Sequence, residues 1–536
     1  MTSPVSSRPS DCAWGAFDDV APWVLDPNNI SWEKQAIELR VSAQREVPVL
    51  TTPTRVPPVA RLVVVVWVLS KALVPWFVKK KLRPFASPED SRAYISLRMR
   101  KAVERLGSTY IKLGQIISSG EGLFPAELVN EFKLCRDQVP AIPFESVKKT
   151  IESELGKPLT EVFSYIDTTA LAAASIAQVH LATLITGEEV VVKVQRPTVS
   201  KMVRKDLRVM AWLAPHLVGR IKVSALANPP ALVELFAETI VEELDFRIEA
   251  SNMLDVAKML CELNQDRYII PRPHPTLATQ RVLVMQRLSG FKFDDVVGMK
   301  DAGIDTHAVI RTGMIAFMEG AMIYGVFHGD LHGGNLFVMP DGRTALLDFG
   351  IVGRLTGARR MAFLRLMLNA TTNNVVGQVE ALRDLGALPM DTDIHAVIKD
   401  LNLGDAAIDP TTLSGEELVK EVQRIVKALM GYGARMPKEL MLYVKNMVFL
   451  DGAIARLAPE LDILAEIASI SMLFAERHGE RLGRELGVDH TAIEINLDSV
   501  KTGVLGVDAS VNSLTYRDLQ ARRELIQKRM RDHVGR

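Results

Sequence analysis

The sequence predicts an α+β fold with two lobes, a small β-rich lobe followed by a larger helical lobe. Between about residues 170 and 288, apolar stretches alternate as in β-strands, and two of them flank a Thr-Gly-Glu-Glu turn. After Gly290 the apolar residues recur at helical spacing, with interruptions at 328–335 and just before Gly350. The 536 residues exceed one ordinary core, so further helical segments are expected around the two lobes.

The same patterns divide the chain into six segments. A start rich in Pro and Ser predicts a mobile tail, and amphipathic periodicity predicts helices on both sides of the lobes. The charged stretch at 514–533 is expected to be a solvated helix face. The predicted segments are the tail (1–58), an apolar segment (59–87), a helical extension (88–165), the β-rich lobe (166–290), the helical lobe (291–460) and a C-terminal helical extension (461–536).

Composition restricts the classes of function. The 64 basic and 64 acidic residues balance, so no general attraction to nucleic acid is expected. Cys12, Cys135 and Cys261 lie far apart without paired spacing, which predicts neither a disulfide framework nor a thiolate zinc site. The first 58 residues lack the pattern of a secretion signal. A cytoplasmic protein is therefore expected.

The apolar stretch at 62–78 has three interpretations. A helix buried against the rest of the protein is the first expectation. An interfacial helix on the cytoplasmic face of a membrane is the second, because the stretch contains tryptophan and is followed by the cations of 79–83. A spanning helix is the third, although Arg61, Lys71 and Pro75 interrupt the roughly 20 apolar residues that a span requires.

Two polar motifs in the helical lobe have the spacing of a phosphoryl-transfer site. In the loop His-Gly-Asp-Leu-His-Gly-Gly-Asn, Asp330 and Asn335 are spaced as in a kinase catalytic loop, where the Asp positions the nucleophile and the Asn binds metal. Asp348 then opens an Asp-Phe-Gly motif and would hold magnesium, a hard cation that prefers oxygen ligands. The pair of motifs predicts a site for ATP and Mg²⁺, with Asn335 and Asp348 as metal ligands.

A lysine in the β-rich lobe is the candidate phosphate ligand. Lys193 lies in the strand-like run Val-Val-Val-Lys-Val-Gln, where alternation would direct one ammonium into the cleft. A surface lysine on a half-buried strand is the alternative. Its acidic partner is not fixed by the sequence alone, because one helical stretch offers four candidates: Glu242, Glu243, Asp245 and Glu249.

Small residues occupy the place of the glycine-rich loop that covers phosphates in typical kinases. The candidates for nucleotide contact there are Ala172, Ala173, Ala174 and Ser175. Their methyl groups limit the close backbone approach that glycine permits. A helix start capped by Ser175 is the alternative interpretation.

With these motifs assembled, residues from about 88 to about 473 resemble the UbiB family of atypical kinases. The family's lysine-glycine-glutamine motif is matched by Lys-Leu-Gly-Gln at 112–115, and its alanine-rich loop by the segment just described. Its acidic motif is matched by Glu243 and Asp245, and its helix glutamate by Glu249. The resemblance implies a bilobal protein-kinase-like fold.

The resemblance also implies roles that spacing does not show. Glu249 would pair with Lys193, and the hinge formed by Met285, Gln286 and Leu288 would contact adenine. The helical extension, with Lys112 and Gln115, would fold over the place of a protein substrate and contact the acidic motif, in a regulatory arrangement. Members of the family are associated with isoprenoid-quinone and other lipid metabolism at membranes, which implies a lipid-like partner.

The chain also departs from the family pattern. The usual catalytic loop, His-Ala-Asp-Pro-His-Pro-Gly-Asn, here has Gly329, Leu331 and Gly333 in place of the alanine and both prolines. The segment 118–122 replaces a serine-threonine-arginine segment, so loop rigidity and docking of the extension can differ. No Ala-Pro-Glu follows Asp348 to close an activation segment, which ordinary kinases use as a platform for peptides. Peptide phosphorylation is therefore not expected.

Three hypotheses for function follow. The leading one is an atypical kinase or ATPase that uses Mg-ATP to act on a lipid-like, isoprenoid- or quinone-related substrate at a membrane. The second is a nucleotide-regulated binding module in a lipid-related complex, in which no phosphate reaches a substrate. The third is a small-molecule phosphotransferase of the aminoglycoside or choline kinase type, because those enzymes have a similar catalytic loop with the Asp as base.

Overall fold

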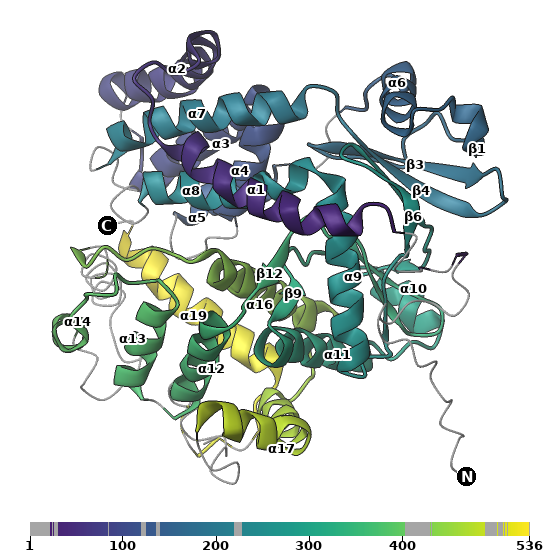
Figure 1. Ribbon diagram of the computed structural model, residues 1–536. Coiled ribbons are helices and arrows are strands. Elements are labelled where there is room, and N and C mark those ends of the chain that lie inside the picture. The colour runs from purple at the N-terminus through teal and green to yellow at the C-terminus, as the bar shows by residue number, and fades with distance from the viewer. Residues whose placement is uncertain are drawn as a thin grey trace, which may run out of the picture.

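The computed structural model has two lobes and a helical bundle beside the smaller one (Figure 1). It describes residues 22–23, 25, 30–83, 85–118, 125–135, 140–218, 228–372, 374–401, 429, 431–487, 501, 508, 510–511 and 513–534. The α+β class and the order of the lobes agree with the expectation from the sequence.

The small lobe is an antiparallel sheet in the order β1-β3-β4-β7-β6, with β2 paired to β3. Side chains alternate along β4, so Val190, Val192 and Val194 face a core that they share with α6. Helix α9 covers the other face. The elements are α6 (Phe144–Leu155), β1 (Phe163–Ile166), β2 (Ala172–Ala173), β3 (Ala177–Leu184), β4 (Glu189–Gln195), α9 (Phe246–Glu262), β6 (Pro273–Ala278) and β7 (Val282–Gln286).

The large lobe is mainly helical and carries two short sheets at its junction with the small lobe. Tyr443 stacks on Phe317 with ring centroids 5.0 Å apart and meets Phe327 and Phe363 edge-on at the centre of its core. The strands are β5 (Tyr268–Ile269), β8 (Phe291–Lys292), β9 (Val326–His328), β10 (Leu336–Val338), β11 (Thr344–Leu346) and β12 (Val352–Arg354). The helices are α10 (Val296–Asp301), α11 (Thr306–Glu319), α12 (Ala358–Thr371), α13 (Val375–Asp384), α14 (Ile394–Leu401), α16 (Lys438–Leu457), α17 (Ile463–Leu486) and α19 (Tyr516–Val534).

A bundle of helices lies beside the small lobe and shares one apolar core. Local signals set its helix ends: Ser87 accepts a hydrogen bond from the backbone of Asp90 and so caps α3. The members are α3 (Pro88–Leu106), α4 (Ser108–Ser118), α5 (Ala126–Lys133), α7 (Val199–Leu217) and α8 (Pro229–Ile240). The helices α3, α4 and α5 of the predicted extension thus pack against α7 and α8, which lie between β4 and α9 in the sequence.

Helix α1 (Glu33–Thr51) lies within the stretch expected to be a mobile tail. It crosses from the small lobe to the bundle (Figure 1). Its start is fixed by Trp32, which is buried and donates its indole hydrogen to the carbonyl of His274 at 3.1 Å. Arg40 anchors its middle to α9. The stretch is ordered because these contacts supply the burial that composition alone did not indicate.

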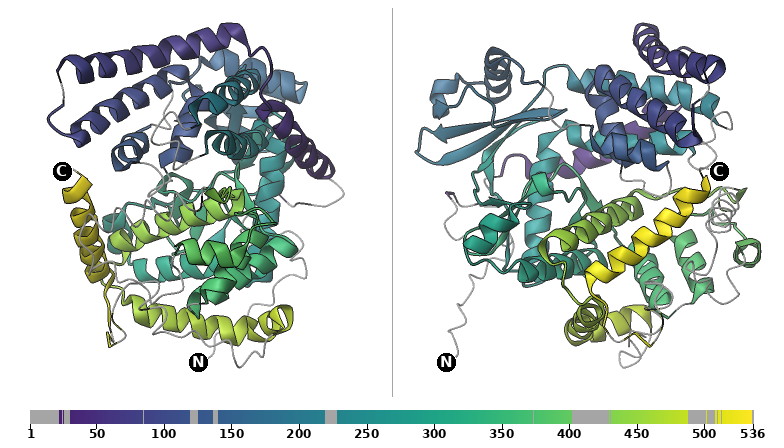
Figure 2. Two further views of the ribbon diagram at one scale, coloured as in Figure 1. Left: turned by 90° about the vertical axis from the view of Figure 1, so that its left-hand side faces the viewer. Right: turned by 180° about the vertical axis from the view of Figure 1, so that it is seen from behind.

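Helix α2 (Val59–Leu82) lies at the outer edge of the bundle, as both views in Figure 2 show. Only Val65, Val68 and Ala72 are buried, so the expected burial against the protein holds for one face alone. Residues at helical spacing on the other side are exposed: Val63 60%, Trp67 57%, Val74 55% and Val78 49%. In the described part of the chain, α2 is the one helix long and apolar enough to cross a membrane by length and composition.

Two smaller expectations differ from the structure. Helix α19 is not solvated on all sides, because Tyr516 and Leu519 are buried where it packs along the large lobe. Cys261, at the end of α9, is disulfide-bonded, and Cys135 is buried. Sequence separation does not report distance in space, so the wide spacing of the cysteines did not exclude a bond.

Candidate nucleotide site

Lys193 occupies the middle of β4 and points to the face opposite the valine core. The side chain is 12% exposed, and its Nζ lies 2.7 Å from Oε1 of Glu249 and 3.1 Å from Oδ1 of Asp348. Both bonds are donated by the ammonium. The structure therefore brings together one residue from the sheet, one from α9 and one from the loop after β11. The alternative of a surface lysine does not describe this geometry.

The four acidic candidates on the helical stretch have separate positions. Glu249 is the one that reaches Lys193. Glu242 pairs with Lys438 at 3.0 Å, and Glu243 pairs with Lys112 at 3.0 Å. Asp245 instead caps α9 by accepting a hydrogen bond from the backbone of Arg247.

The pKa values of the two partners of Lys193 differ from their ordinary values in opposite directions. Burial raises the pKa of Glu249 to about 7, although the ammonium of Lys193 partly offsets this. Burial also raises the pKa of Asp348, but Lys193 and Lys112 outweigh it and lower the value to about 2. Asp348 is thus ionised at neutral pH, as a carboxylate that binds a metal would have to be.

The Asp-Phe-Gly segment has a strained backbone at its first residue. Asp348 has a φ of 55°, in the left-handed region that costs a non-glycine residue about 1 kcal/mol or more. Its Oδ1 accepts a hydrogen bond from Gly350 at 3.2 Å, and the carbonyl of Phe349 accepts one from Asn252 of α9 at 2.8 Å. These contacts fix the segment around the carboxylate, whose side chain is 49% exposed.

The loop at 328–335, predicted to be the catalytic loop, begins at the end of β9 and is held by a buried histidine. His328 lies within hydrogen-bonding distance of the carbonyl of Asp348, with Nε2 at 2.8 Å, and its Nδ1 accepts from the backbone of Asp330 at 3.1 Å. Burial lowers the pKa of His328, which suits a neutral ring that donates through Nε2. The amide nitrogen of Asn335 donates to the carbonyl of Asp330 at 3.0 Å, which ties this side chain to the loop.

Asp330 has an ion-pair partner that the sequence did not indicate. Lys445 of α16 donates to its Oδ1, and the next residue, Asn446, bonds the loop backbone. Burial raises the pKa of Asp330, but the charges of Lys445 and Lys112 outweigh it and hold the pKa well below its ordinary value. Neither residue belongs to a recognisable motif, and more than a hundred positions separate them from the loop.

The alanine segment forms a turn between two strands. Ala172 and Ala173 make up β2, and the backbone of Ala174 donates to Ala177 at 2.9 Å to close the turn. Ser175 is buried inside it. The segment has strand and turn geometry, so the alternative of a helix start capped by Ser175 is wrong. The segment is thus a strand-turn-strand at the start of β3, the arrangement expected of a loop that covers phosphates.

The predicted hinge residues lie at the end of β7, where the chain leaves the sheet of the small lobe. Met285 is half-buried against the main core, and Leu288 follows β7. Gln286 is buried, and its side chain accepts a hydrogen bond from the backbone of Arg272 at 3.2 Å. The backbone N–H of Gln286 also donates to the carbonyl of Arg272 at 2.9 Å, so both its side chain and its backbone donor are engaged with the neighbouring segment.

The extension reaches the site through α4. Lys112 points from this helix to Glu243 and is 19% exposed. Burial lowers the pKa of Lys112, but the charges of Glu243, Asp330 and Asp348 outweigh it and raise the pKa above its ordinary value. Gln115 lies one turn further along α4 and is half-buried. Positions 119–122 of the divergent segment lie outside the described residues.

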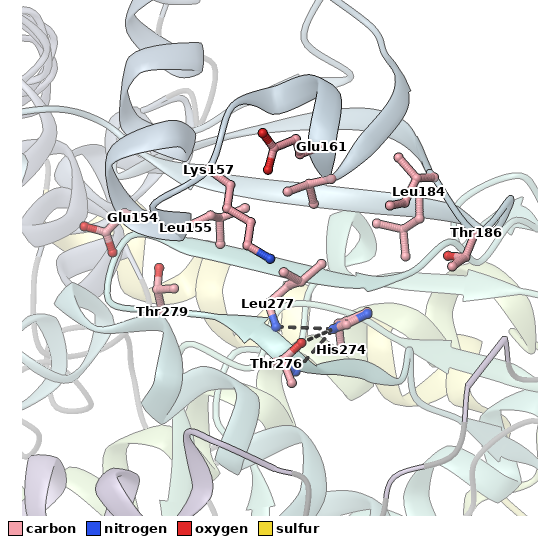
Figure 3. A pocket seen from close by; sticks show the side chains of 12 residues that line it. Glu154, Leu155, Lys157, Glu161, Leu184, Thr186, His274, Thr276, Leu277 and Thr279 are labelled. Atoms are coloured by element: carbon pink, nitrogen blue, oxygen red, sulfur yellow. Dashed lines mark hydrogen bonds between the residues drawn. The ribbon is translucent and has the colours of Figure 1, made fainter.

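A hollow lies on the face of the small lobe opposite Lys193 and is not lined by these groups. Figure 3 shows it between the end of α6, the end of β3 and β6, where Leu184, Lys157 and His274 are among its lining residues. Leu184 belongs to the same core as the valines of β4, whereas Lys193 points the other way. The hollow is therefore not the nucleotide cleft.

Comparison with known proteins decides the family. The model of the ABC1 atypical kinase-like domain matches residues 134–382. An uncharacterized protein of Mycobacterium tuberculosis is 34% identical over 366 residues, which cover 67% of this chain and 74% of that protein. The chain belongs to the ABC1 atypical kinase-like family. The resemblance to the UbiB family, based on the lysine-glycine-glutamine and acidic motifs among others, is confirmed.

Two further relatives of this ABC1 family member have informative names. An uncharacterized aarF domain-containing protein kinase of Arabidopsis thaliana chloroplasts is 32% identical, covering 69% of this chain and 73% of the relative. A Marinobacter nauticus protein named "Probable protein kinase UbiB" is 30% identical, covering 73% of this chain and 70% of the relative. The kinase-like character of the fold is therefore shared across bacterial and chloroplast members.

The residues present fit the Mg-ATP that this family implies. Asn335 offers an amide oxygen and Asp348 an exposed carboxylate, the hard donors that Mg²⁺ prefers. The described residues hold no group of three or more His, Cys, Asp or Glu placed to bind a metal ion. Two protein ligands suffice here, because Mg²⁺ takes its remaining ligands from phosphates and water.

Proposed function

We propose that this protein binds Mg-ATP between its lobes and acts as an ATPase or small-molecule kinase on a lipid-like substrate at a membrane. The observation that carries the proposal is the position of Lys193, whose ammonium bonds Glu249 and Asp348 at once. Phosphoryl transfer depends on positioning and charge, and this triad supplies a cation and a metal ligand in fixed geometry.

Each residue has a role in the proposed site. Lys193 contacts the phosphates, and Asn335 and Asp348 hold Mg²⁺. Asp330 orients the hydroxyl or water that attacks. The turn at 172–175 covers the phosphates with backbone amides, as far as the methyl groups allow.

The membrane part of the proposal is supported by α2. Its exposed face carries Trp67 and several valines, and the cations of 79–81 follow in its last turn. Lys71 lies 3.6 Å from the ring centre of Trp67, and this pair suits the level of lipid headgroups. A lipid-like substrate, isoprenoid- or quinone-related, would be reached from that surface. Phosphorylation of peptides is not proposed, because the sequence lacks the substrate platform.

Nucleotide binding and turnover test the proposal. Purified protein should bind ATP in the presence of Mg²⁺ and hydrolyse it, with and without vesicles of anionic lipid. Asp348→Asn should keep the fold, but magnesium should no longer strengthen its binding of ATP. A folded wild-type protein that neither binds nor hydrolyses Mg-ATP would refute the proposal. The substrate class would come from comparing lipids in cells with wild-type protein and with Asp348→Asn.

A second candidate is a nucleotide-regulated binding module. The observation that favours it is the Lys112–Glu243 pair, which places α4 beside Asp330 and Asp348 where an acceptor would enter. Asp330→Asn separates the two functions. If cells keep their function with a folded variant that binds ATP without hydrolysing it, binding alone is sufficient.

The third hypothesis, a phosphotransferase of the aminoglycoside or choline kinase type, loses its support. It rested on the catalytic loop, and membership in the ABC1 family accounts for that loop together with the extension and the alanine turn.

A further inference from the structure

The catalytic loop needs an external support in this chain. It contains Gly329, Gly333 and Gly334, and glycine adds backbone freedom that a folded loop must lose. Inside the loop, His328 and Asn335 bond to the backbone of Asp330, but neither touches its carboxylate. The direction of that carboxylate must be set by another element.

Helix α16 supplies three bonds to this loop from two adjacent residues. The amide of Asn446 donates to the carbonyl of His328, and its oxygen accepts from the backbone of Leu331 at 3.0 Å. Asn446 is fully buried, so these bonds do not compete with water. Lys445 donates to Oδ1 of Asp330. The helix thus binds the loop before Asp330, at Asp330 and after it.

The helix is itself fixed by the core of the large lobe. Tyr443, two residues before Lys445, stacks on Phe317 of α11 and meets Phe327 edge-on. Phe327 immediately precedes His328, so the same aromatic cluster anchors the end of β9 and the helix that faces the loop. Side chains that are held this way position a reactive group within narrow limits.

We propose that Lys445 is a positioning residue for Asp330: its ammonium fixes one carboxylate oxygen so that the other faces the acceptor hydroxyl or water. Lys112 is the other lysine near Asp330, but it belongs to the extension and pairs with Glu243. Lys445 belongs to the core of the lobe and stays with Asp330 if the extension moves. The inference rests on the proposed function, since it concerns the acceptor side of the same site.

Steady-state ATP turnover with variants of Lys445 tests this role. In Lys445→Met, kcat is expected to fall at least about tenfold while KM for Mg-ATP changes less than about threefold, because the nucleotide ligands are untouched. Lys445→Arg should recover most of kcat, since it restores a cation that can donate to the carboxylate.

The matched control is Lys438→Met. Lys438 lies on the first turn of the same helix and makes an ion pair of similar burial with Glu242 at 3.0 Å, away from Asp330. Its loss should leave kcat near the wild-type value. The inference is overturned if Lys445→Met keeps kcat within about twofold of wild type, if Lys438→Met lowers kcat equally, or if Lys445→Arg is no better than Lys445→Met.

A wild-type protein without turnover would refute the enzymatic part of the proposed function, and Lys445 would then be decided by stability. The melting temperatures of Lys445→Met, Asp330→Asn and the double variant form a cycle. A double variant that loses less than the sum of the single losses supports the fixed pair. Additive losses overturn it.

Discussion

The ammonium of Lys193 lies 2.7 Å from the carboxylate of Glu249, although 56 positions separate the two residues in the chain. The pair joins the sheet of the small lobe to α9. A third residue, Asp348, completes the contact from the large lobe at 3.1 Å. The Nζ atom of Lys193 therefore contacts residues of both lobes. Substitution of Lys193 should affect nucleotide binding before other properties.

Replacing Lys193 should weaken Mg-ATP binding. Lys193→Met removes a charged donor to the phosphates, and such bonds are worth about 1.5–3 kcal/mol, or roughly ten- to a hundredfold in affinity. Isothermal titration with Mg-ATP measures the loss. Lys258→Met is the control, because Lys258 forms an exposed pair with Glu262 on α9. Equal affinities of the two variants would contradict a phosphate role for Lys193.

The raised pKa of Glu249 predicts a pH dependence of stability. The folded pKa is about 7 and the ordinary value 4.5, so the folded protein binds a proton between these pH values that the unfolded chain releases. The contribution of Glu249 to the unfolding free energy therefore falls as pH rises from 4.5 to 7. In denaturant unfolding, the unfolding free energy of the wild type should fall relative to that of Glu249→Gln as pH rises through this window. Parallel pH profiles would contradict the shift, and Glu262→Gln serves as the exposed control on the same helix.

Lys112 is expected to restrain the extension over the site. In Lys112→Met the cation beside Asp330 and Asp348 is lost, α4 loosens and acceptors gain access, so ATP turnover should rise. The buried carboxylate of Glu243 is left unpaired, which costs up to about 3–5 kcal/mol of stability. The double variant Lys112→Met/Glu243→Gln should regain stability and keep the raised turnover.

The control for this prediction is Lys101→Met, which removes an exposed lysine of α3. Turnover and nucleotide selectivity of Lys112→Met equal to those of this control would show that the extension does not regulate the site.

The exposed face of α2 should bind anionic bilayers. Trp67→Ser and Phe77→Ser each remove a large exposed apolar side chain, and burying such a group is worth about 1.5–3 kcal/mol. Co-sedimentation with vesicles should therefore fall about tenfold or more for each variant. Binding of the wild type should weaken with salt, because the cations of 79–81 contribute. Met472→Ser, which changes a residue 73% exposed on α17, should bind as wild type does. Equal binding by all variants would exclude α2 as the membrane surface.

Arg40 should link the stability of α1 to that of α9, the helix that carries Glu249 of the nucleotide site. It donates to Ser251 and Asn252 at 2.8 Å and to Asp255 at 3.0 Å, all on α9. Arg354, which follows the Asp-Phe-Gly segment, shares Asp255 at 2.6 Å and can neutralise it alone. Arg40→Ala is therefore expected to lower the unfolding free energy by only about 1–3 kcal/mol.

The consequence of Arg40→Ala should be local. Hydrogen exchange in α9 and in the segment after β11 should accelerate more than elsewhere, while the exposed control Arg45→Ala should leave it unchanged. Uniform exchange in both variants would show that α1 has no specific link to the site.

The sequence by itself determined the lobes, the family and the motif residues at the nucleotide site. These features are local: alternation in β4, helical periodicity, and the fixed spacing of Asp330, Asn335 and Asp348 all reside in short stretches. Such patterns predict the structure of their own segments, because the backbone geometry of a helix or a strand sets the spacing of apolar residues in each segment separately.

Tertiary structure alone decided which partners these residues have. Four acids on one stretch were equivalent by spacing alone; the family resemblance implied Glu249, and the packing of α9 on the sheet brings it to Lys193. Lys445 and Asn446 reach the catalytic loop across more than a hundred positions and belong to no motif. Helix α1 is ordered by burial of Trp32 and by the bonds of Arg40, which composition could not reveal. Long-range contacts depend on how whole elements pack, and no single segment of the sequence encodes that packing.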